Sequence, residues 1–172
     1  DGHHRVEAAK RHGLTHVFAE IRKGLTSADA EAEAFKSNEA SETSIPMTFV
    51  DHAEYIWQKQ AEGVKQEEIG KRIGWSRGKV SQHASLEKID KQVWKKIATN
   101  FSSQCSRGNN DDVAENATNV ANIFSEGLLR DIIQLTPAQQ LELVSGLADG
   151  TLTKGKFKQQ ADNYLNRNDM LA

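Results

Sequence analysis

The stretch KQEEIGKRIGWSRGKVSQH, residues 65–83, gathers side chains that can bind a polyanion and read its surface. Arginine can donate two parallel hydrogen bonds to guanine O6 and N7, and glutamine can pair in a similar way with adenine. Lysine and serine suit phosphate oxygens, which carry no sequence information. The candidate DNA-binding residues are therefore Gln66, Lys71, Ser76, Arg77, Gly78, Lys79, Ser81 and Gln82.

Two short helices joined by a tight turn must position these side chains. Residues 66–73 place Ile69 and Ile73 one helical turn apart, so both can face inward. Gly74 supplies the backbone freedom that a sharp turn needs. Gly70 costs about 1 kcal/mol relative to alanine inside a helix, so we expect a reason for it, such as the close approach of a second helix.

The second helix is expected to begin after Ser76, whose hydroxyl can cap it, and to place Val80 against the apolar face of the first. A small residue, a turn glycine and an aliphatic residue at this spacing are typical of a helix-turn-helix. A plain helical hairpin with a glycine turn would show the same pattern, and His83 replaces the aliphatic residue usual at its position. The polar exposed side of the helix favours DNA binding.

The charges of the chain are segregated, although its net charge is only −2. Residues 59–107 hold eleven basic and five acidic residues, a net charge of +6. Residues 1–25 carry +2, whereas residues 26–58 carry −6 and residues 108–172 carry −4. A basic block between acidic blocks suits a local polyanion-binding surface. The alternative is a lysine-rich helical face that is merely solvated.

A second candidate chemistry lies in DGHHR at the start of the sequence. Gly2 permits a tight turn, the first amides of the following helix can receive a phosphate, and Arg5 can neutralise it. A helix that starts after a glycine and binds no ligand would look the same. A metal site is a further alternative, although Gly13 interrupts the helical spacing of the four histidines that could form it, His3, His4, His12 and His16.

The rest of the sequence is patterned mainly for helices. Alternating β-branched and aromatic residues in THVFAEI predict one strand at 15–22. Polar breaks are expected at 41–47 and 102–112. Apolar periodicity and capping residues predict helices at 3–12, 26–40, 49–62, 66–73, 113–124, 126–135, 137–149 and 153–167. Two further helices are expected to begin at 76 and at Asp90.

Several of these motifs together resemble the ParB family. Residues 64–89, VKQEEIGKRIGWSRGKVSQHASLEKI, look like its central helix-turn-helix. Residues 1–14, DGHHRVEAAKRHGL, look like its nucleotide-phosphate motif, with His3-His4-Arg5 where the family more often has Glu-Arg-Arg. KSNEASETSIP is similar to the next family motif, and residues 132–162 resemble the helical segment that follows. The resemblance is weakest at 98–125.

The resemblance implies a mainly α fold in two parts. Residues 1–45 would be the C-terminal part of a small α/β nucleotide-binding domain, and residues 46–172 a helical helix-turn-helix DNA-binding domain. The nucleotide would be CTP, bound with Mg²⁺, and a complete protein could hydrolyse the CTP. The residues that the resemblance implies for its binding are Gly2, His3, His4, Arg5, Asn38 and Glu39.

The function implied is sequence-specific binding of double-stranded DNA in the partition of a plasmid, phage or chromosome. The protein would be cytoplasmic, associated with the nucleoid or a plasmid, and would act as a homodimer on a palindromic or repeated site, with a ParA-type ATPase as a further partner. No apolar run approaches the roughly 20 residues of a membrane span, and the single Cys105 fits a reducing compartment.

Three alternatives stay open beside partition. The protein could be a ParB-like transcriptional regulator, a ParB-like nuclease, or a module whose acidic segments bind a protein. A metal-dependent nuclease needs carboxylates near the basic surface, where Glu67 and Glu68 lie, although acidic residues also suit the first turn of any helix. No Ser-His-Asp set, Walker loop or Cys–His pair can be named, so the sequence does not define a classical enzyme.

Overall fold

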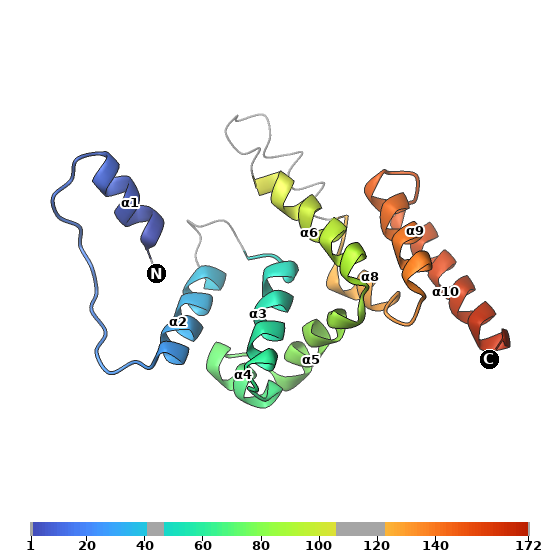
Figure 1. The fold of residues 1–172 in the computed structure, drawn as a ribbon, viewed down its shortest axis with the longest axis horizontal. Helices are drawn as coiled ribbons and strands as arrows, with labels where there is room; N and C mark the ends of the chain where they lie inside the picture. The colour runs from blue at the N-terminus through green and yellow to red at the C-terminus, as the bar shows by residue number, and fades with distance from the viewer. Residues whose placement is uncertain (1, 41–46, 106–122, 172) are drawn as a thin grey trace. The chain divides into compact units, whose positions relative to one another are not determined.

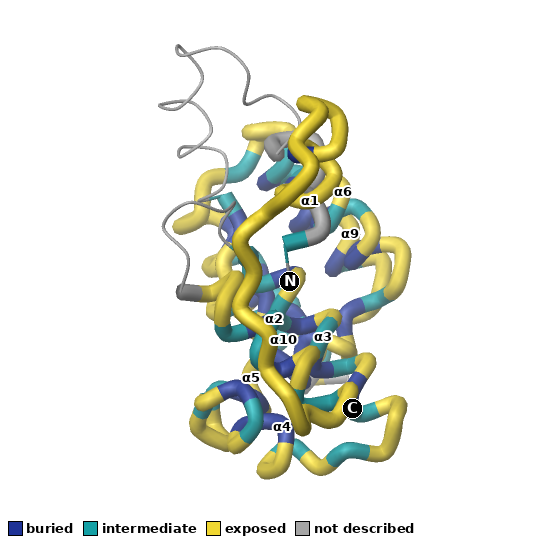
Figure 2. Tube along the Cα trace, turned by 90° about the vertical axis from the view of Figure 1, so that its left-hand side faces the viewer, coloured by how far each residue is buried: buried dark blue, intermediate teal, exposed yellow. Residues whose placement is uncertain are grey.

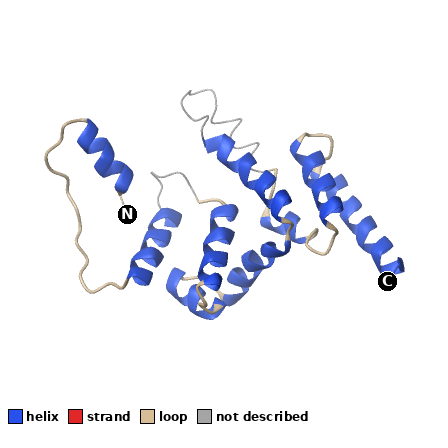
Figure 3. Ribbon diagram, in the orientation of Figure 1, coloured by secondary structure: helices blue, strands red, loops and turns tan. Residues whose placement is uncertain are grey.

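The computed structural model of the protein describes residues 2–40, 47–105 and 123–171, which contain helices and no strand (Figures 1 and 3). The mainly α expectation is confirmed. The chain divides into two compact units, Asp1–Ser44 and Ile45–Ala172. The helices are α1 (His3–Arg11), α2 (Ser27–Ala40), α3 (Phe49–Ala61), α4 (Gln66–Ile73), α5 (Arg77–Ser85), the 3₁₀-helix η1 (Leu86–Lys88), α6 (Lys91–Cys105), α8 (Glu126–Arg130), α9 (Pro137–Ala148) and α10 (Lys154–Leu171).

The strand predicted at 15–22 is wrong. This segment has no regular secondary structure and lies in a stretch that is exposed along its whole length (Figure 2). Phe18 is fully exposed, and Ile21 is 81% exposed. A strand is stable only when neighbouring strands satisfy its backbone and cover one face, and the described residues provide no such neighbour. The α/β character expected of residues 1–45 therefore has no support in the part of the chain that the structure describes.

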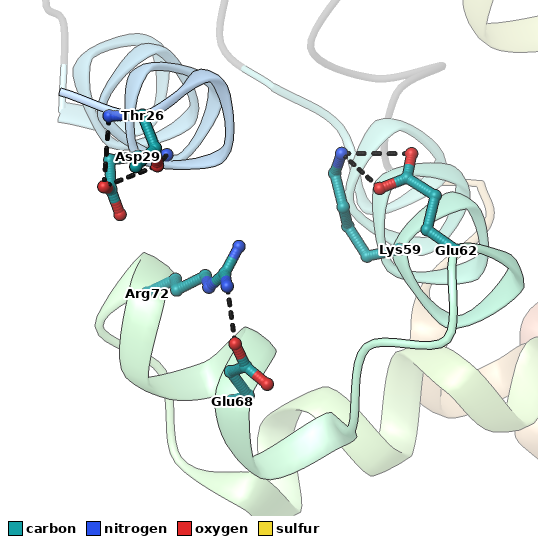
Figure 4. Close-up of polar contacts among 6 residues, drawn as sticks. All are labelled: Thr26, Asp29, Lys59, Glu62, Glu68 and Arg72. Carbon is teal, nitrogen blue, oxygen red and sulfur yellow. Dashed lines mark hydrogen bonds and ion pairs between the residues drawn. The ribbon is translucent and has the colours of Figure 1, made fainter.

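The helix predicted after Thr26 is present as α2, and its start is fixed by local hydrogen bonds (Figure 4). The Thr26 hydroxyl accepts the Asp29 backbone N–H at 3.2 Å and donates to Asp29 Oδ2 at 2.6 Å. The Thr26 hydroxyl thus satisfies a backbone N–H that the start of a helix otherwise leaves without a partner, and the Asp29 carboxylate accepts the proton of that hydroxyl. The helix predicted at 3–12 is present as α1, which follows Gly2. The break predicted at 41–47 lies outside the described residues, apart from Met47.

The C-terminal unit is built on a shared apolar core. Its largest fully buried members come from distant parts of the sequence and include Leu86, Ile97, Leu129, Leu143 and Phe157. α6 packs against α9, and α9 packs against α10. α3 shares this core through Val50 and Ala53, and it also packs against α4 and α5.

Aromatic side chains join α3 to α6 within this core. Phe49 meets Trp94 and Phe101 edge to face, with ring centroids 6.4 and 5.1 Å apart. Trp57 lies 4.6 Å from Trp94, and its indole N–H donates to the Ala84 carbonyl of α5 at 3.3 Å. Because one ring contacts α6 and donates a hydrogen bond to α5, α3 ties the start of the unit to both later helices.

One buried polar side chain, Gln140 of α9, connects two other segments, the residue before α6 and the turns at 131–135. Its carbonyl oxygen accepts the Asp90 backbone N–H at 2.9 Å, fifty residues away in the sequence. Its amide donates to the carbonyls of Ile132 and Leu135, each at 3.1 Å. Gln140 is only 2% exposed, so these bonds replace the water that its amide would otherwise need.

Several predicted boundaries differ from the structure. The loop predicted at 102–112 begins later, because α6 continues to Cys105; the rest of that loop lies outside the described residues. Phe101 is 9% exposed and anchors this last part of α6 to the core. The helix predicted at 126–135 ends at Arg130, and turns follow it. Of the helix predicted at 113–124, only Ile123 and Phe124 lie among the described residues, and neither is helical.

Candidate nucleic-acid interface

The two short helices predicted around Gly74 are present as α4 and α5, with their bounds near those expected. α4 buries Ile69, Gly70 and Ile73, and its first turn carries acidic residues that suit the positive end of the helix dipole. Gly74 ends α4 with φ of 78°, the left-handed conformation that glycine adopts without strain. α3 packs against both helices and supports their corner.

The second helix expected to approach Gly70 does so through Val80 of α5, but the nearest atom belongs to the backbone of the turn. A Cβ atom at this position would lie 2.6 Å from the Trp75 carbonyl oxygen and 3.4 Å from Val80 Cγ2. The Trp75 backbone N–H donates to the Gly70 carbonyl at 2.8 Å. Glycine therefore lets the turn close over α4 while α5 packs beside it.

α5 has one buried side and one exposed side. Ser76 caps it as predicted, with its Oγ accepting the Lys79 backbone N–H at 3.2 Å. Val80, His83 and Ala84 are buried. Four predicted DNA-binding residues lie together on the exposed side of the helix, Arg77, Gly78, Ser81 and Gln82. Together with Ser76 at the helix start, these residues place hydrogen-bond donors and acceptors on the side of α5 that does not pack against the rest of the unit.

Lys79 differs from its exposed neighbours, because its ammonium lies over an aromatic ring. Lys79 Nζ is 3.4 Å from the centroid of Trp75 in the preceding turn. That ring meets His52 of α3 at 4.8 Å and His83 of α5 at 5.1 Å. The Lys79 carbonyl accepts a hydrogen bond from His83 Nδ1 at 3.0 Å. Sequence reasoning missed Trp75 as the residue that holds Lys79, although its spacing of four residues was a usable signal.

The basic residues of α4 are paired with acidic residues one turn earlier. Lys71 Nζ lies 2.9 Å from Glu67 Oε1, and Arg72 forms an ion pair with Glu68 (Figure 4). The hydrogen bond from Lys71 and its positive charge hold the pKa of Glu67 below its usual value. The same pair raises the pKa of Lys71. Gln66, also predicted to bind DNA, is the first residue of α4 and is half-buried.

The residues predicted to bind a nucleotide lie in the N-terminal unit on two helices. Gly2 precedes α1 with φ of 88°, and its position places the Arg5 guanidinium beside the helix start: a Cβ on Gly2 would lie 3.8 Å from Arg5 Nη2. Asn38 and Glu39 lie exposed in the last turn of α2. The side chains of His3 and His4 lie outside the described part of the structure.

Within the described residues, no group of three or more histidine, cysteine, aspartate or glutamate side chains is arranged to hold a metal ion. In the same residues, no helix has both the length and the apolar character needed to cross a bilayer. Comparison of the chain with protein-family models and with curated proteins finds no match.

Proposed function

We propose that α4, the turn at Gly74 and α5 form a helix-turn-helix that binds double-stranded DNA, with α5 as the recognition helix. The proposal includes the ParB-like role: sequence-specific binding at a palindromic or repeated site by a homodimer, in DNA partition or in transcriptional regulation. The observation that carries it is the two-sided construction of α5. Its buried side fixes the helix to the unit, while Arg77, Ser81 and Gln82 stay exposed.

The position of each side chain on α5 supports a division of roles. Arg77 begins the helix, and the N-terminal part of a recognition helix is the part that meets base edges. Gln82 lies five residues later, about 7.5 Å along the helix axis, within reach of a neighbouring base pair. Both side chains end in planar forks that suit base edges, whereas the ammonium of Lys79 suits phosphate.

The basic character of this part of the chain predicts salt-dependent binding to duplex DNA. Each phosphate that the protein neutralises should contribute about −0.9 to the slope of log affinity against log salt. Fluorescence anisotropy with a labelled duplex at several salt concentrations measures this slope. A flat salt response would contradict the proposal, because a surface that binds the DNA backbone must release counterions.

The division of roles predicts different losses for two substitutions in α5. Arg77→Ala should weaken binding to the preferred duplex by roughly 1–3 kcal/mol and binding to a scrambled duplex little. Lys79→Ala should weaken both about equally and make the salt slope shallower by roughly one unit. Selection from a random DNA pool supplies the preferred duplex, and titration of each variant at two salt concentrations tests both. Equal losses for Arg77→Ala on the two duplexes would make Arg77 a phosphate contact.

We also propose that the turn before α1 binds the phosphates of a nucleotide such as CTP with Mg²⁺. The left-handed Gly2 and the nearby Arg5 guanidinium support this role, because they place a positive charge beside a helix N-terminus, which itself favours a phosphate. Arg5→Ala should lower CTP binding at least tenfold in equilibrium dialysis with Mg²⁺, since a charge-assisted phosphate contact is lost. Lys10→Ala, an exposed basic residue of the same helix, is the control. Equal affinity in Arg5→Ala and the unmodified chain would exclude Arg5 as the phosphate partner.

A further inference from the structure

Glu67 brings a negative charge into the surface that we propose for DNA. Its carboxylate lies 2.9 Å from Lys71 Nζ, one turn along α4. Both side chains are largely exposed, Lys71 at 74% and Glu67 at 66%. An exposed ion pair of this kind contributes little to stability, so a DNA phosphate can compete with the carboxylate for Lys71 but must overcome this pairing.

The surroundings of Glu67 include a positive charge from the second helix. Its pKa is lowered first by the hydrogen bond and charge of Lys71, and the guanidinium of Arg77 adds to this effect. Glu67 thus lies in the positive field of one α4 cation and one α5 cation, both predicted to bind DNA. A carboxylate in this field meets the same charges that a DNA phosphate would meet.

We propose that Glu67 competes with DNA phosphate for Lys71 and so weakens the binding of the α4–α5 surface to DNA of any sequence. This inference rests on the proposed function. The preferred duplex and a scrambled duplex both present phosphates to Lys71, so the competition lowers the affinity for both by about the same factor. Base contacts from α5 do not depend on Lys71. Glu67 therefore limits the phosphate-dependent part of DNA binding, by repulsion of phosphate and by pairing with Lys71.

Glu67→Gln tests this role, because it removes the charge and keeps the shape of the side chain. Binding to a scrambled duplex at low salt should tighten roughly 3- to 10-fold, and the salt slope should become more negative by about 0.9, since Lys71 then neutralises one more phosphate. Tightening on the preferred duplex should be about the same factor, because both duplexes present phosphates to Lys71. The control is Glu87→Gln, which makes the same change of net charge at an exposed position of η1.

A double substitution shows whether the effect passes through Lys71. In a Lys71→Gln background, Glu67→Gln should lose at least half of its tightening effect, measured as the change in log affinity. Equal tightening by Glu87→Gln, or an undiminished effect without Lys71, would overturn the inference. If the unmodified chain binds DNA and Glu67→Gln binds it with the same affinity, the inference is also overturned, while the proposed function stands. Failure of the unmodified chain to bind any duplex would overturn the proposed function itself.

Discussion

Replacing Gln140 with methionine is expected to lower the free energy of unfolding by roughly 3–4 kcal/mol. Methionine keeps the length of the side chain and removes both polar atoms. The Asp90 N–H, whose bond to Gln140 is partly buried, and the Leu135 carbonyl, whose bond is buried, then lose the partner that Gln140 gives them. The Ile132 carbonyl keeps a second bond, from the Leu135 N–H at 3.0 Å, so its loss is smaller.

Urea denaturation followed by the helical circular dichroism signal measures this loss. Gln159→Met is the matched control, because Gln159 is exposed on α10 and the chemical change is the same. The control should differ from the unmodified chain by less than about 0.5 kcal/mol, as is usual for surface substitutions. If both variants unfold at the same urea concentration, the hydrogen bonds of Gln140 do not hold α9 to the segments around it.

Gly70→Ala is expected to cost roughly 3 kcal/mol, at the upper end of the range for overpacking. The new Cβ would lie 2.6 Å from the Trp75 carbonyl oxygen, which belongs to the backbone of the turn and cannot rotate away as a side chain could. Relief of this contact must move the turn that positions Ser76 and the start of α5. Affinity for DNA should therefore fall together with stability.

Gly78→Ala is the control for this substitution, since it makes the same change eight residues later on the exposed side of α5. A Cβ there would meet only Ser76 Oγ, at 3.9 Å. Its stability should not fall and should rise by up to about 1 kcal/mol, because alanine is favoured over glycine in a helix. Urea denaturation of the two variants side by side decides between them. Equal stability would mean that the turn does not pack on Gly70 as described. Because Gly78→Ala keeps the fold, its DNA affinity separately tests whether DNA approaches the backbone at Gly78.

Local signals were enough to predict most helices of this protein. Ser76, Thr136 and Asp90 each accept hydrogen bonds from backbone N–H groups two or three residues further on, so their role can be inferred from a few neighbouring residues. Gly74 and Gly150 follow the helices that they were expected to follow, with φ of 78° and 73°. The corner of α4 and α5 was predictable for the same reason, including the need for glycine at position 70.

Contacts between distant residues could not be predicted in this way. The sequence favoured a strand at 15–22, yet a strand depends on partners elsewhere, and the described residues supply none. Nothing near Gln140 in the sequence indicates that its amide would bind a backbone N–H fifty residues away. The ring of Trp75, which lies under Lys79, also contacts His52 of α3, and no local pattern indicates that second contact.

In the candidate interface too, some features follow from the local sequence and others only from the tertiary structure. The sequence by itself determined which residues face outward on α5, because helical periodicity and a capping serine fix the two sides of a short helix. Only the tertiary structure placed Glu67, which is already paired with Lys71 of its own helix, in the field of Arg77 from the second helix. The physical reason is range: caps and periodicity act within about four residues, whereas the field at a side chain sums the charges that folding brings together from separate helices.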